Sequence, residues 1–270
     1  MALKICIVGG TGAFGVFYAK LFSRYGFNVT IAGRNPKKAA KTARSLKCKS
    51  APFERAVSSS DVVIISVPIE ATPKVIARAI PFMRRNSLLM DFTSVKAEAV
   101  KAMKRARCRE VVSCHPMHGP NMHSIKGQAV IFVPIRKGPK YKAIRQFFEQ
   151  SKAQCCECSA EEHDKVLSVV QVLAHALFIN AASTICALNI DAKKARAFST
   201  PIYKLASTAM ARIFSQEPEL YAQIQMRNPY AQSAHNEFIK QARALAEIVE
   251  KKDSRAFDSL FRKAAKHLKK

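Results

Sequence analysis

Apolar and polar positions along the chain follow two different patterns, and the change between them falls near residue 160. Before it, short apolar runs rich in Ile and Val alternate with stretches in which apolar residues recur at helical spacing. Such alternation predicts an α/β fold with a doubly wound (Rossmann) parallel sheet. The predicted strands cover residues 3–8, 28–32, 61–67, 87–91, 110–114 and 128–133, and clear helices cover residues 13–25, 36–46 and 141–151.

After residue 160 only helical spacing is found, over residues 161–188, 200–214, 217–226, 229–249 and 254–268. We therefore expect two domains, a dinucleotide-binding domain over residues 1–158 and an all-helical substrate and dimerisation domain over residues 159–270. The helix at 161–188 is apolar on more than one side, which is typical of a helix buried on several faces. Because so small a helical domain offers little to cover it, we expect a homodimer.

The composition is strongly basic, with 45 Lys and Arg against 19 Asp and Glu and a net charge of +26. These residues are spread along the chain, without an arginine-rich tail or interleaved aromatic residues, so no specific nucleic-acid partner is expected. A basic field also attracts anionic ligands, such as a phosphorylated cofactor and a dicarboxylate.

Membrane and metal signals are weak. We expect no membrane span, because the apolar runs are too short for one. The N-terminal residues run directly into a glycine turn without room for a signal peptide, so a cytoplasmic protein is expected. The eight cysteines show no framework spacing. Cys155, Cys156 and Cys158 lack a Cys-x-x-Cys pair, which favours an edge strand over a metal site.

The run Gly10-Thr11-Gly12-Ala13-Phe14-Gly15 matches Gly-x-Gly-x-x-Gly and lies between a predicted strand and a predicted helix. In that context Gly10 permits a tight turn, Gly12 lets a pyrophosphate approach the backbone, and Gly15 lets the helix pack on the strand. The run therefore predicts a dinucleotide-binding site at the helix N-terminus.

The second strand indicates which dinucleotide is bound. Where an NAD enzyme carries Asp or Glu, this chain has Arg34, followed by Asn35 and Lys37. A guanidinium can pair with a 2′-phosphate, so NADP is expected in preference to NAD. Ser66, Val67 and Pro68 end another strand and are expected to line the cofactor beside the nicotinamide ribose.

Two further segments end strands at the same edge of the predicted sheet. Ser94 lies in Asp91-Phe92-Thr93-Ser94-Val95-Lys96, where it is also a candidate N-cap of the next helix. His115 lies in Ser113-Cys114-His115-Pro116-Met117-His118-Gly119-Pro120. This run puts a histidine where a dinucleotide-binding domain ends, which is where a bound substrate would meet the cofactor.

These segments, with Glu162-His163-Asp164, His175 and Ala211-Arg212-Ile213 before Pro218-Glu219-Leu220-Tyr221, resemble the prephenate/arogenate dehydrogenase family in a form without a chorismate mutase domain. The resemblance implies NADP-dependent oxidative decarboxylation of the dicarboxylate prephenate to 4-hydroxyphenylpyruvate, a step of tyrosine biosynthesis. It gives the catalytic role to His115, assisted by Ser94. It implies substrate binding by His175 and Arg212, with His118 and Lys204 as further candidates. His163 is interpreted only as a residue at a helix start.

Three alternatives stay open. The substrate can be arogenate, which carries an amino group in place of the side-chain keto group. The glycine turn with Gly33-Arg34 also resembles NADP-dependent coenzyme F420 reductases, which predicts no role for His115 or Arg212. The net charge also suggests the alternative of a redox-sensing or nucleic-acid-binding protein that has a dinucleotide fold. This alternative predicts no turnover.

Overall fold

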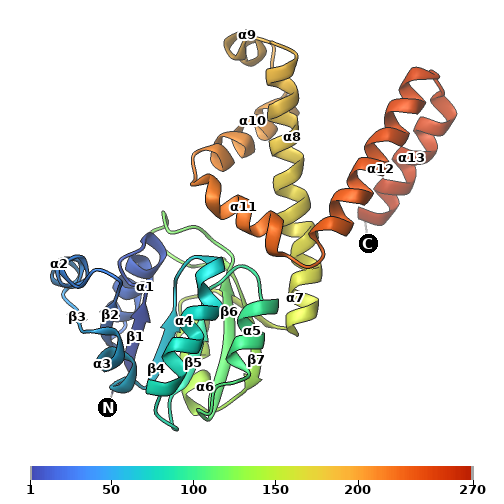
Figure 1. Ribbon diagram of the computed structural model, residues 1–270. Helices are drawn as coiled ribbons and strands as arrows, with labels where there is room; N and C mark the ends of the chain where they lie inside the picture. Colours follow the sequence, from blue (N-terminus) through green and yellow to red (C-terminus); the bar gives the residue numbers. More distant parts are fainter. Residues whose placement is uncertain (1, 269–270) are drawn as a thin grey trace. The chain divides into compact units, whose positions relative to one another are not determined.

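A computed structural model describes residues 2–268, and it divides into two compact units (Figure 1). The first unit contains residues Met1–Val166 and Pro218–Asn228, and the second contains Leu167–Glu217 and Pro229–Lys270. The boundary predicted at residue 158 thus precedes the division between the units, because most of the following helix belongs to the first unit, with His163 and Asp164 buried. As a statement about domains, the boundary at 158 stays a prediction.

The first unit is built on an eight-stranded sheet in the order β3-β2-β1-β4-β5-β6-β7-β8. All neighbouring strands are parallel except β6 and β7, which pair antiparallel. The Rossmann-type sheet that the alternating pattern predicts is therefore confirmed. Its strands are β1 (Lys4–Val8), β2 (Asn28–Ala32), β3 (Lys49–Ser50), β4 (Val62–Ile65), β5 (Leu88–Asp91), β6 (Glu110–Pro116), β7 (Ala129–Arg136) and β8 (Gln154–Glu157).

Helices cover both faces of this sheet because successive strand residues point to opposite faces. Ile5 and Ile7 of β1 belong to one core with side chains of α1 and α6, whereas Cys6 and Val8 belong to the other with α3, α4 and α5. The helical elements of this unit are α1 (Ala13–Arg24), α2 (Pro36–Leu46), α3 (Phe53–Ser58), η1 (Ile69–Ala71), α4 (Thr72–Ala79), η2 (Ile80–Phe82), α5 (Ala97–Met103), α6 (Pro139–Gln150), most of α7 (Ala160–Leu167) and α11 (Pro218–Arg227).

The second unit is helical, as predicted. Its elements are the π-helical segment η3 (Ser168–Leu173), α8 (Ala174–Ala187), α9 (Ala192–Ala197), α10 (Pro201–Phe214), α12 (Ala231–Glu250) and α13 (Ser254–Leu268). Pro201 and Pro218 occupy the first turns of α10 and α11, whereas α12 begins two residues after Pro229. The short elements β3 and α9 had no counterpart in the sequence prediction.

The helix predicted at 161–188 forms as one helix over Ala160–Ala187, with η3 in its middle. In the single chain Val169 and Val170 are 58% and 52% exposed, so the burial of several faces of this helix stays a prediction that requires a second subunit. The sequence expectation on membrane spans needs correction. By length and composition this helix could cross a bilayer, although one such helix is weak support for a membrane protein.

Candidate active site

The glycine turn between β1 and α1 forms an open cradle at the carboxyl edge of the sheet. A side chain at Gly10 would lie 2.6 Å from Cβ of Ile31, and one at Gly15 would lie 2.6 Å from the carbonyl oxygen of Gly9. A Cβ at Gly12 would meet a single neighbour, the Gly9 oxygen at 3.4 Å, and no side chain caps the helix that Gly12 begins. Uncapped amides at a helix N-terminus beside a glycine without close neighbours fit the pyrophosphate of a dinucleotide.

The end of β2 lies beside this cradle, because a Cβ at Gly33 would be 3.3 Å from the side chain of Thr11. Arg34 and Lys37 follow and are exposed. Asn35 is the N-cap of α2, where its side-chain oxygen accepts a hydrogen bond from the Lys38 amide at 3.0 Å. Asn35 thus holds the loop on which Arg34 lies.

The end of β4 forms the other side of the cradle. The Ser66 amide donates to the Val8 carbonyl at 2.8 Å, and any side chain at Gly9 would collide with the Ser66 carbonyl. Pro68 begins the turn η1, which Thr72 closes by donating its hydroxyl to the Pro68 carbonyl at 3.1 Å. Ser66, Val67 and Pro68 therefore lie against the glycine turn.

His115 extends beyond the end of the neighbouring parallel strand. The pairing of β5 with β6 ends at Asp91 and Ser113, while β6 continues to Pro116 by pairing antiparallel with β7. His115 and Ser113 point to the same face because they are two residues apart on a strand. The His115 side chain is 3% exposed. The sheet thus places a buried imidazole at the carboxyl edge that carries the glycine cradle.

A charged cluster lies on the same face. Lys96 is fully buried, and its Nζ is 3.1 Å from Oδ1 of Asp91 and donates to the Cys114 carbonyl at 2.7 Å. The Ser113 hydroxyl donates to the other oxygen of Asp91 at 2.5 Å, and the Thr93 amide donates to Oδ1 at 2.9 Å. The ion pair is therefore fully hydrogen-bonded on the carboxylate side, which is the condition for burying charge.

Two residues of α7 complete the surroundings of His115, and the sequence assigned neither to the site. His163 Nε2 lies 3.0 Å from His115 Nδ1, and His163 Nδ1 lies 2.8 Å from Oδ1 of Asp164. Both side chains are buried. The available sequence signal was an acidic helix start with a histidine inside it, Glu162-His163-Asp164, but a contact across 48 positions leaves no local pattern.

Asp164 also caps α5. Its two carboxylate oxygens accept the amides of Lys96 and Ala97 at 2.9 and 2.8 Å. The alternative role of Ser94 as an N-cap is therefore wrong, because the helix begins at Ala97 and its capping carboxylate comes from α7. Ser94 is partly exposed, three residues beyond the end of β5. Its proposed catalytic role stays a prediction.

Electrostatics keep the two histidines neutral. Burial lowers the pKa of His115 well below its usual value, and Lys96, His163 and His118 lower it further. Burial also lowers the pKa of His163, against the opposing hydrogen bond to Asp164. Both imidazoles are therefore neutral near pH 7, so His115 can accept a proton there.

His118 lies in an aromatic cluster instead of pointing freely from its loop. Its Nδ1 is 2.9 Å from the Gly119 carbonyl, which can only accept, so Nδ1 donates and Nε2 accepts the Tyr18 hydroxyl at 2.8 Å. The His118 ring also packs against Phe14 and Phe17. Both ring nitrogens are thus bonded within the protein. Substrate contact by His118 stays a prediction. In this arrangement only the surface of the ring, and neither nitrogen, is available for such a contact.

The remaining predicted substrate residues lie in the helical unit. His175 is half-buried and is the second residue of α8, and burial lowers its pKa. Arg212 lies in the last turn of α10 and Lys204 lies earlier on the same helix, both exposed. Their substrate roles stay predictions.

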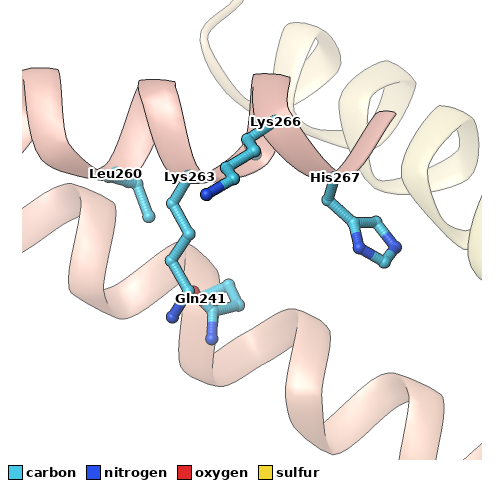
Figure 2. A pocket seen from close by; sticks show the side chains of 6 residues that line it. Gln241, Leu260, Lys263, Lys266 and His267 are labelled. Carbon is cyan, nitrogen blue, oxygen red and sulfur yellow. The ribbon is translucent and has the colours of Figure 1, made fainter. Parts of the chain in front are cut away.

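No group of three or more His, Cys, Asp or Glu residues that could hold a metal is found among residues 2–268. Cys155 and Cys156 lie on the edge strand β8, as the sequence indicated. A surface hollow of 470 Å³ lies between α12 and α13, and Figure 2 shows its lining, which includes Lys263, Lys266 and His267. None of the predicted site residues lines it.

Comparison with known proteins finds two family models that match successive parts of the chain. Residues 18–157 match the family model "Prephenate dehydrogenase, nucleotide-binding domain", and residues 159–263 match "Prephenate dehydrogenase, dimerization domain". A probable arogenate/prephenate dehydrogenase of Methanocaldococcus jannaschii is 36% identical over 98% of this chain, and a T-protein of Haemophilus influenzae is 31% identical over 83%. The chain spans 61% and 56% of the length of these two relatives.

The fold has close counterparts among solved structures. The prephenate dehydrogenase of Aquifex aeolicus, solved with hydroxyphenyl propionate and NAD+, superposes with a TM-score of 0.77 at 22% identity. The match covers 100% of this chain and 98% of that one. At this identity the likeness shows the fold alone.

Proposed function

The chain belongs to the prephenate dehydrogenase family, and we propose that it oxidises prephenate with NADP and releases 4-hydroxyphenylpyruvate and CO2. The observation that carries this proposal is the neutral, buried His115 at the sheet edge that also holds the glycine cradle. A hydroxyl-bearing ring carbon next to a nicotinamide at that edge would need a base for its proton. His115 is the residue whose position and lowered pKa suit that task.

The proposed chemistry balances with one base. As the C–H bond of the ring carbon breaks and the hydrogen leaves with both bonding electrons as hydride, the hydroxyl proton moves to Nε2 of His115. Bound NADP supplies the hydride acceptor. Cleavage of the ring carboxylate bond then places an electron pair in the ring and releases CO2, which makes the ring aromatic and leaves a phenolate oxygen. The proton on His115 returns to that oxygen, so the histidine ends the cycle neutral.

Two features support NADP as the cofactor. Arg34 and Lys37 are exposed where β2 ends, so both can approach a 2′-phosphate. Gly33 lies against Thr11 of the glycine turn, which places this loop beside the cradle. Thr11, Ala13, Phe14 and Ser66 are proposed as further cofactor contacts. NAD is the alternative cofactor, and an Arg34→Asp variant should lose NADP affinity while it keeps or gains NAD affinity.

The exposed apolar surface of the helical unit supports a homodimer. Phe198, Ile202 and Leu205 are 78%, 75% and 71% exposed in the single chain, and large exposed apolar surfaces mark interfaces. We propose that a second copy of the chain covers this surface. Light scattering after size-exclusion chromatography should give twice the chain mass, and Leu205→Glu should shift it toward monomer, whereas Lys251→Glu at another exposed position should not.

The deciding experiment mixes purified protein with prephenate and with arogenate, each with NADP or NAD, and follows reduced-cofactor absorbance. Reduction with prephenate and NADP that is lost in His115→Gln supports the whole proposal. Turnover of arogenate alone keeps the chemistry and changes the substrate. No reduction by a protein that binds NADP contradicts the proposal and favours the F420 alternative. Variants Arg212→Gln, His175→Gln and Lys204→Gln test the predicted substrate contacts through KM.

A further inference from the structure

His115, His163 and Asp164 form a chain of hydrogen bonds whose proton positions can be assigned. Both oxygens of Asp164 accept backbone amides, from Lys96 and Ala97. An ionised carboxylate has no proton to donate, so the 2.8 Å contact with His163 Nδ1 requires that nitrogen to donate. The start of α5 and the first turn of α7 therefore fix one end of the chain.

The assignment then passes from ring to ring. A neutral imidazole carries one N–H, so His163, which donates from Nδ1, has a lone pair at Nε2. That nitrogen lies 3.0 Å from His115 Nδ1 and can only accept, so His115 donates from Nδ1. Nε2 of His115 must then carry the lone pair. Neutral histidine in water favours the opposite tautomer, with its proton on Nε2.

We propose that His163 and Asp164 are positioning residues that hold His115 in the Nδ1–H tautomer and so present Nε2 as the base for the substrate hydroxyl. The inference rests on the proposed function for its catalytic consequence, although the tautomer itself is a property of the free protein. The same chain also acts after proton transfer. When Nε2 of His115 binds a proton, the positive ring donates to His163, which is bonded to an anion.

Charged groups from three directions face the hydrogen-bonded residues His115, His163 and Asp164. Lys96 opposes a positive charge on His115, and His163 from α7 and His118 from the loop after β6 would oppose it when they are themselves protonated. Asp164 and, more weakly, Asp91 favour a positive charge on His163, again against Lys96. Burial also opposes a positive charge on both rings. The chain of hydrogen bonds therefore orients His115 as a neutral base and does not make it positively charged before the substrate reacts.

The test combines one spectroscopic and one kinetic measurement on the full-length protein. Histidine ring ¹⁵N shifts report which nitrogen carries the proton, and the signals of His115 are assigned by their loss in His115→Gln. His163→Gln keeps an acceptor, because its amide oxygen can take the place of ring Nε2. His163→Leu removes the acceptor. His267→Leu, at an exposed position on α13, is the matched control.

The expected result is a protonated Nδ1 and a bare Nε2 at His115 in the wild type and in His163→Gln. His163→Leu should lose about 10²- to 10⁴-fold in kcat, the usual worth of a positioned base, with KM little changed. His163→Gln should lose far less, and the control should behave as wild type. A proton on Nε2 of His115 in the wild type overturns the inference, whatever the substrate. Equal kcat losses in the Gln and Leu variants overturn it as well, provided that both variants fold.

Discussion

Lys96→Met should be among the most destabilising single changes in the first unit. The substitution keeps most of the side-chain volume but removes an ammonium that is 3.1 Å from Asp91 and fully buried with it. Breaking one half of a buried ion pair typically costs about 3–5 kcal/mol, because the other charge is left without compensation. Asp91 would keep its bonds from Ser113 and Thr93, so we expect about 3 kcal/mol, the lower end of that range.

A double-mutant cycle separates the ion pair from the rest of the site. The cycle compares wild type, Lys96→Met, Asp91→Asn and the double variant by urea unfolding. Far-UV circular dichroism is the suitable signal because the chain has no tryptophan. The double variant should be more stable than Lys96→Met, since no buried carboxylate charge is then left alone. Lys101→Met is the matched control, because Lys101 and Glu98 form an exposed pair at 4.0 Å.

The reasoning is refuted if Lys96→Met loses less than about 1 kcal/mol, the typical effect of an unremarkable substitution. It is also refuted if Asp91→Asn fails to improve the Lys96→Met background. A kinetic result provides a separate check. Lys96 lowers the pKa of His115, so its removal should shift the acidic limb of the kcat/KM profile to higher pH.

Two further predictions concern pH and the glycine turn. The pKa values of His115, His163, His118 and His175 are lowered in the folded chain, so on acidification the unfolded chain binds protons first, and stability should fall as pH drops below about 6.5. Thermal unfolding between neutral and mildly acidic pH measures this, and a His163→Gln variant should show a shallower decline. Gly10→Ala should destabilise the fold because its Cβ would collide with Ile31, whereas Gly12→Ala should fold normally and bind NADP more weakly. Equal melting temperatures for the two glycine variants would contradict the geometry.

Parts of the site that depend on local sequence were predictable. The glycine run lies within one strand–turn–helix unit and is recognised from that local context. The residues that shape its cradle could therefore be identified from spacing alone. His115 could be located because it follows a recognisable apolar strand. Asp91 ends one predicted strand and Ser113 is the last residue but one of the next, and their pairing could also have been expected from parallel register.

Parts that depend on distant contacts were not predictable from one sequence. His163 meets His115 across 48 positions, and Asp164 meets the start of α5 across 67 and 68 positions. A histidine between acidic residues at a helix start most often faces solvent, and no periodicity marks the exception. The two-residue strand β3 and the Lys-rich helix α9 were missed for a simpler reason, since they are too short to show a period.

The cap supplied by Asp164 explains why the site needs a distant carboxylate. A local cap such as Ser94 would satisfy the first amides of α5, but it would leave α7 unconnected to that helix. Asp164 instead binds two backbone amides of α5 and the ring of His163 with the same two oxygens. The orientation of His163 is therefore tied to backbone geometry and not to a flexible side chain. His115 receives that constraint through a single hydrogen bond, so the same contacts that join α5 to α7 also direct the lone pair of the proposed base.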